Sequence, residues 1–162
     1  FVDPGLVRAI ENALRELPPL RRVCEQRDFS PWNILRTPEG ALSVLDWESS
    51  ERRGLPALDL IYFLAYLALY LDSALRDGRH RASFRRSLDP GTLTGSVARE
   101  CLEGYAGRTG VPPKALRPLR LLAWLLPSRS EYRHLTEDGG GRADPERLRR
   151  SLFLDLLKEE LG

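Results

Sequence analysis

The sequence predicts an α+β fold that is mostly α, in which a small antiparallel sheet packs on about five helices. Short extended stretches lie before residue 47, whereas the apolar residues after Pro56 repeat at helical spacing almost throughout. The 162 residues are 42% hydrophobic and 30% charged, which is enough for a domain with a real core. We therefore expect residues 1–162 to form a single domain.

The N-terminal segment predicts a helix that ends before residue 18. Asp3 and Pro4 supply a helix cap and a first-turn proline, and Pro18 with Pro19 stops the helical pattern. The apolar residues between these signals repeat at helical spacing: Leu6, Ile10, Leu14 and Leu17.

Three short strands follow this helix. Residues 22–26 and 34–36 are extended candidates, and the turn at 37–40 leads into a third candidate at 41–46. We expect them to form one small antiparallel sheet around the loop that joins the first two.

The remainder of the chain predicts helices at about 56–76, 92–107, 114–134 and 145–160. Pro118 and Pro127 are expected to break or kink the third of these helices. Residues 138–141, Asp-Gly-Gly-Gly, predict a flexible connection before a helix start at Asp144 and Pro145.

Composition excludes several classes of partner. The formal charge of +2 is spread over mixed acidic and basic residues, so no nucleic-acid partner is expected. The longest apolar run, 60–71, spans 12 residues and is short of the roughly 20 needed to cross a membrane, so no membrane partner is expected either. Cys24 and Cys101 are far apart in apolar sequence, which predicts buried free thiols and a cytoplasmic protein.

The segment 24–47 carries the candidate chemistry. Asp28, Asn33 and Asp46 stand at loop ends beside two of the predicted strands. Phosphoryl transfer from a nucleotide uses Mg²⁺, which prefers hard oxygen ligands, and Asn33 with Asp46 can supply such a pair. The Asp-x-x-x-x-Asn spacing lets one loop aim a carboxylate at the attacking hydroxyl, which makes Asp28 the candidate catalytic base.

Three sequence patterns resemble the aminoglycoside phosphotransferase and choline kinase family, which is related to the protein kinases. They are the run Gln26, Arg27, Asp28, Phe29, Ser30, Pro31, Trp32, Asn33, the strand end Val44, Leu45, Asp46, and the helix start Gly54, Pro56, Asp59, Leu60. Together they cover residues 23–71, about a third of the chain. The resemblance implies a kinase-like C-terminal lobe whose small sheet carries the catalytic loop, and an enzyme that uses Mg²⁺ and ATP, or another nucleoside triphosphate, to phosphorylate a hydroxyl of a small molecule.

The resemblance also assigns supporting residues. Asp59 is expected to accept backbone N–H groups of the catalytic loop, or else to be an ordinary first-turn acid. Gln26 stands where the family usually has a histidine that braces the loop, and glutamine still forms hydrogen bonds. Arg27 is either a loop-fixing charge or exposed, and Glu48 is either an auxiliary metal or substrate ligand or a solvated acid.

One part of the resemblance is missing from the sequence. Before Asp28 there is no glycine-rich hairpin and no lysine, since the first lysine is Lys114. We expect the chain to be a fragment of a longer protein, whose N-terminal nucleotide-clamping lobe is its partner. We expect the fragment alone to be inactive.

Two alternatives remain open. One is a pseudokinase-like binding or scaffolding module that has lost catalysis, which the glutamine at position 26 makes credible. The other is a helical domain in which the motif is accidental. Several acids are candidates for binding a cationic acceptor, and the sequence does not choose among them: Glu100, Glu103, Glu131 and Asp138.

Overall fold

The computed structural model describes residues 4–138 and 144–161. The predicted cap Asp3 and the predicted glycine connection at 139–141 lie outside the described residues. Within them the chain is mostly helical with short antiparallel strands, which confirms the prediction of an α+β class that is mostly α. None of the described helices is long and apolar enough to span a membrane.

The helices begin and end as follows: α1 Pro4–Arg15, α2 Leu58–Leu71, α3 Ala74–Asp77, α4 His80–Leu88, α5 Leu93–Thr109, α6 Leu116–Asp138, α7 Pro145–Arg149 and α8 Leu152–Leu161. Two 3-10 turns, η1 Pro31–Asn33 and η2 Pro113–Ala115, lie directly before residue 34 and before α6. The strands are β1 Val23–Glu25, β2 Ile34–Arg36, β3 Leu42–Val44 and β4 Glu51–Gly54.

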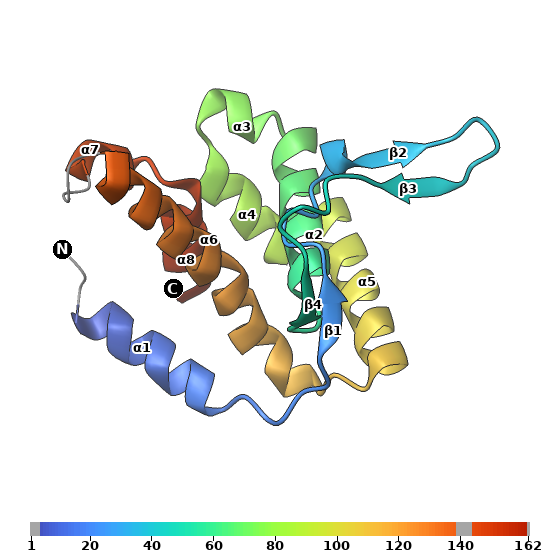
Figure 1. Cartoon of the computed structure of the whole chain (residues 1–162), viewed down its shortest axis with the longest axis horizontal. Coiled ribbons are helices and arrows are strands. Elements are labelled where there is room, and N and C mark those ends of the chain that lie inside the picture. The colour runs from blue at the N-terminus through green and yellow to red at the C-terminus, as the bar shows by residue number, and fades with distance from the viewer. Residues whose placement is uncertain (1–3, 139–143, 162) are drawn as a thin grey trace.

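The strands form two separate two-stranded sheets, so the prediction of a single sheet was wrong. β1 pairs with β4, and β2 pairs with β3 in a hairpin that extends away from the helices (Figure 1). β4 escaped prediction because it reads Glu-Arg-Arg-Gly, with no apolar alternation. Its Gly54 is required by packing, because a Cβ atom there would overlap the side chain of Glu25.

The helical region also differs from the sequence prediction. The sequence analysis did not predict α4, because this helix is rich in arginine. Its own Phe84 is nevertheless buried in the core. The helix predicted at 145–160 is two helices, α7 and α8. α6 is continuous: Pro118 lies in its first turn, where no backbone N–H is needed, and the helix runs through Pro127 without ending.

The hydrophobic core lies among α2, α4, α5, α6 and α8, and α1 packs on its edge (Figure 1). Trp124 of α6 is fully buried and meets Phe84 edge-to-face, with ring centroids 5.4 Å apart. The other large, fully buried apolar side chains are Leu69, Leu119, Leu121, Leu156 and Leu157. Cys24 and Cys101 are free as predicted, but Cys24 is exposed and Cys101 half-buried, so their predicted burial was wrong.

Ion pairs hold the C-terminal helix α8 against its neighbours. Glu159 accepts from Arg81 at 3.0 Å and from Arg85 at 2.6 Å, both on α4. The carboxylate of Glu160 accepts from Arg120 of α6 at 2.8 Å. These contacts fix α8 beside the cavity described below.

Candidate active site

The loop between β1 and β2 is fixed at its start by the first turn of α2. The carboxylate of Asp59 accepts the backbone N–H of Gln26 at 2.7 Å and that of Arg27 at 2.9 Å. A carboxylate that accepts two backbone N–H groups holds them in one geometry, because the hydrogen bonds are charge-assisted. Asp59 therefore sets the path of the chain just before Asp28.

Gln26 joins this loop to the end of β3. Its side chain is buried, with 1% of the residue exposed. Its Nε2 donates to the carbonyl oxygens of Leu45 at 3.0 Å and Asp46 at 2.6 Å, while its Oε1 accepts the backbone N–H of Asp28 at 2.8 Å. One amide side chain thus contacts the backbone of both candidate site segments.

Two residues of the site have left-handed backbone conformations that L-amino acids rarely adopt. The φ angle is 75° at Arg27 and 56° at Asp46. Such residues persist where the surrounding contacts determine them, and here those contacts are the hydrogen bonds of Asp59 and Gln26. The side chain of Arg27 is exposed and lines the cavity, where its positive charge acts on the carboxylate of Glu25.

Asp28 and Asn33 are in direct contact. Nδ2 of Asn33 donates to the carbonyl oxygen and to Oδ2 of Asp28, both at 2.9 Å. The turn between them is closed by backbone hydrogen bonds through Ser30, whose side chain is fully buried. Because both amide protons of Asn33 are used, its Oδ1 is the group left to face a ligand.

Asp46 lies next to this pair through the backbone. The N–H of Leu45 donates to the carbonyl oxygen of Asn33 at 2.8 Å. Leu45 is therefore the cross-strand neighbour of Asn33, and Asp46 is the next residue along the chain. Asp46 is exposed, and no side-chain hydrogen bond or ion pair of its carboxylate is found among residues 4–138 and 144–161. Glu48, two residues further on, is also exposed.

Asn33 and Asp46 fit the requirements of Mg²⁺ in ligand type. An amide oxygen and a carboxylate are hard oxygen donors, and Mg²⁺ is commonly bound through one or two such groups together with substrate phosphates and water. In the part of the chain that the structure describes, no cluster of three or more His, Cys, Asp or Glu residues is placed to hold a metal ion. A site built on this pair therefore needs ligands from a bound phosphate and from water.

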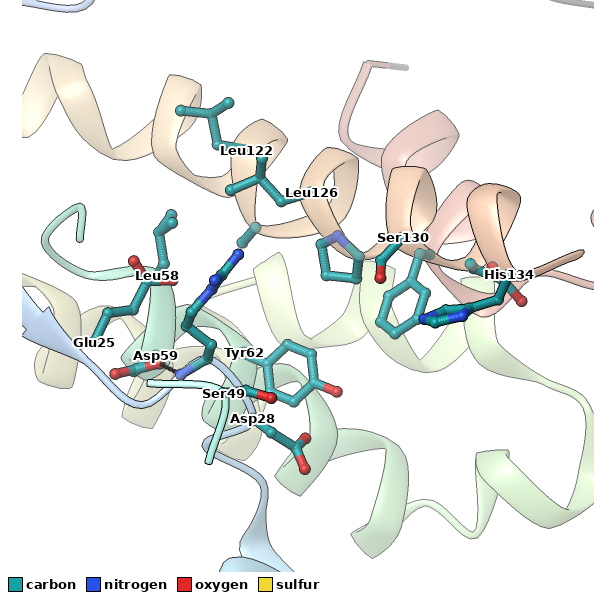
Figure 2. A pocket seen from close by; sticks show the side chains of 15 residues that line it. Glu25, Asp28, Ser49, Leu58, Asp59, Tyr62, Leu122, Leu126, Ser130 and His134 are labelled. Carbon is teal, nitrogen blue, oxygen red and sulfur yellow. Dashed lines mark hydrogen bonds between the residues drawn. The ribbon is translucent and has the colours of Figure 1, made fainter. Parts of the chain in front are cut away.

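A cavity of about 520 Å³ opens beside Asp28. Figure 2 shows Asp28, Asp59 and Tyr62 on one side of it and α6 residues, including Ser130 and His134, on the other. Phe153 of α8 and Glu131 of α6 also line it. The cavity combines apolar and aromatic walls with a few polar groups, which is typical of a small-molecule site.

Sequence reasoning missed Tyr62, which forms part of the wall of this cavity. Tyr62 follows Asp59 by three residues and therefore shares its helix face, which was a usable signal. His134 is exposed and also lines the cavity. Among the four candidate acids for acceptor binding, Glu131 lines the cavity, where Ser151 donates to its carboxylate.

Glu25 is the buried acid of the site. Its Oε2 accepts the backbone N–H of Leu55 at 3.1 Å. Burial is the largest influence and raises the pKa of Glu25, and the nearby carboxylate of Asp59 raises it further. A raised folded-state pKa means that the charged form destabilises the fold, so stability is lost as the pH rises through the pKa of Glu25.

We expect Glu25→Gln to raise the melting temperature at pH 7, because glutamine keeps an acceptor for Leu55 and removes the buried charge. The gain should shrink as the pH falls through the raised pKa of Glu25, and it should be absent below about 4.5, the ordinary pKa of this carboxyl group. Thermal unfolding at pH 7 and at acidic pH measures both effects, with the exposed Glu11→Gln as control. A variant that melts lower than wild type at pH 7 would contradict this.

Comparison with known proteins does not identify the chain: no family model, no curated protein and no solved structure matches it.

Proposed function

We propose that this chain is the kinase-like C-terminal lobe of a phosphotransferase that moves the terminal phosphoryl group of ATP, or of another nucleoside triphosphate, to a hydroxyl of a small molecule. Asp28 is the base that accepts the hydroxyl proton. Asn33 and Asp46 would hold Mg²⁺, which would neutralise charge on the phosphates. The acceptor occupies the cavity between Asp28 and α6.

The observation that carries this proposal is the contact between Asp28 and Asn33 at the edge of a cavity, in a loop held by Asp59 and Gln26. An ordinary turn that contains Asp and Asn has no need of a buried glutamine and a helix-start carboxylate to fix it. Catalysis of phosphoryl transfer depends largely on positioning and electrostatics, and the contacts of this loop serve positioning.

The proposed reaction proceeds in one displacement. The acceptor hydroxyl gives its proton to the Asp28 carboxylate while its oxygen bonds to the γ-phosphorus. The bond from that phosphorus to the β–γ bridging oxygen breaks, and the nucleoside diphosphate leaves with the bridging electron pair. Asp28 then returns its proton to solvent.

The segments that carry Asn33 and Asp46 also carry apolar side chains that a second lobe can cover. Large apolar side chains beside these residues are exposed: Trp32 to 52%, Leu35 to 53% and Trp47 to 48%. Exposed apolar groups gathered in one region mark a contact surface more often than a solvent face. In the full-length protein we propose that a nucleotide-clamping lobe covers them.

The test is transfer of phosphate from ATP by the full-length protein, followed by ³¹P NMR with a panel of sugar, amino and aliphatic alcohols. We expect a phosphate ester and ADP in equal amounts, formed only with Mg²⁺, and a fall of at least about 100-fold for Asp46→Asn. Glu137→Gln removes an exposed carboxylate of α6 and serves as the control. Turnover that is equal in Asp46→Asn and in wild type would remove Asp46 from the site.

The glutamine at position 26 also leaves a binding module without catalysis as a second candidate function. A protein of that kind would bind a nucleotide or a cavity ligand and form no phosphate ester. The same measurement, together with calorimetric titration of ATP, separates the two candidates.

A further inference from the structure

α2 presents three functional groups toward the loop from one face. Asp59, Tyr62 and Tyr66 are spaced by three and four residues, which places them one above the other along a helix. Asp59 binds the loop backbone, as described above. The two tyrosines lie further along the same face, where the side chain of Asp28 stands.

The ring of Tyr62 is held by aromatic neighbours from three helices. Its centroid lies 4.5 Å from that of Tyr66, 6.4 Å from that of Phe153 on α8, and 6.5 Å from that of the fully buried Trp124 on α6. Tyr66 in turn packs edge-to-face against Trp32, with ring centroids 5.2 Å apart. A ring packed in this way directs its hydroxyl to one place, because few other rotamers fit the space.

That place lies at the cavity, near the side chain of Asp28. Figure 2 shows the Tyr62 hydroxyl beside Asp28 at the cavity, and both residues line it. Burial raises the pKa of Tyr62, and the hydroxyl of Tyr66 and the Asp28 carboxylate raise it further through charge and hydrogen bonding. Tyr62 therefore stays neutral at working pH and keeps a proton to offer an acceptor.

We propose that Tyr62 is a positioning residue that orients the Asp28 carboxylate together with Asn33. Nδ2 of Asn33 already donates to Oδ2 of Asp28. A second donor would fix the rotation of the carboxylate about its side-chain bond, in the orientation that receives the acceptor hydroxyl. The inference rests on the proposed function of Asp28 as a base and adds a residue that the sequence patterns do not include.

The test compares Tyr62→Phe with wild type in the full-length protein under saturating acceptor and ATP. We expect kcat to fall about 10- to 100-fold with KM within about twofold, because a lost hydrogen bond to a charged group affects the base rather than acceptor binding. Tyr70→Phe, which removes an exposed hydroxyl one turn beyond Tyr66, is the control and should keep both constants.

Two results would overturn the inference. A rise in KM with kcat unchanged would mean that the hydroxyl binds the acceptor instead of positioning Asp28. A lower melting temperature with both constants unchanged would mean that the hydroxyl only stabilises the fold.

A second measurement separates failure of this inference from failure of the proposed function. In full-length protein with ¹³C-labelled aspartate, Tyr62→Phe should shift the carboxyl resonance of Asp28, and Tyr70→Phe should leave it in place. If the resonance shifts and no alcohol is ever phosphorylated, the contact stands and the function fails. An unshifted resonance removes the contact itself.

Discussion

Replacing Asp28 by asparagine is expected to lower kcat for phosphate transfer roughly 10²- to 10⁴-fold, the range that a general base contributes. The side chain keeps its shape, and its amide oxygen still accepts from Nδ2 of Asn33. What the variant loses is the group that takes the proton of the acceptor hydroxyl. The melting temperature should therefore stay close to that of wild type.

This experiment requires steady-state kinetics in the full-length protein with an acceptor found in the ³¹P screen. Glu137→Gln removes a surface carboxylate of α6 and should leave kcat within about twofold. Equal turnover in Asp28→Asn and in wild type would remove Asp28 from the mechanism. A large fall accompanied by unfolding would leave the chemical role unsupported.

Replacing Gln26 by methionine is expected to lower the free energy of unfolding by about 2–3 kcal/mol. Methionine has nearly the same volume and no amide, so it leaves the carbonyl oxygens of Leu45 and Asp46 and the N–H of Asp28 without their partner. Loss of the same contacts should also lower kcat, because the segments that carry Asp28 and Asp46 are no longer tied to each other.

Gln26→His is the matched variant. An imidazole ring has one donor and one acceptor, so it can keep the Asp28 contact and one of the two carbonyl contacts. We expect it to lose about 1 kcal/mol, and urea unfolding of the three proteins should rank wild type above histidine and histidine above methionine. Methionine and histidine variants of equal stability would show that the hydrogen bonds of Gln26 contribute nothing beyond packing.

The parts of the site that are local in sequence could be predicted. Asp28 and Asn33 belong to one turn, and the hairpin that brings Asp46 beside them is signalled by the Pro38-containing turn between its strands. The position of Asp59 against the loop followed from the resemblance. The structure places its carboxylate on the two N–H groups just before Asp28.

The parts that depend on packing between distant segments could not be predicted. β4 is a strand because it pairs with β1 and packs on Glu25, and its charged sequence carries no sign of this. Likewise, α4 is buried through Phe84 alone among large apolar residues, which gives a weak periodic signal. The far wall of the cavity comes from α6 and α8, some hundred residues after Asp28, and no local pattern reports such a contact.

Because Asp59, Tyr62 and Tyr66 all lie on α2, the spacing of these residues along the helix determines which side chains face the loop. Each residue of an α-helix is rotated by about 100° from the one before it. A single inserted residue between Asp59 and Tyr62 would therefore turn the tyrosine away from the loop while leaving composition and hydrophobicity almost unchanged. The distance between these residues along the chain matters as much as their identity, so the first turns of α2 should tolerate exchanges of side chains far better than changes of length.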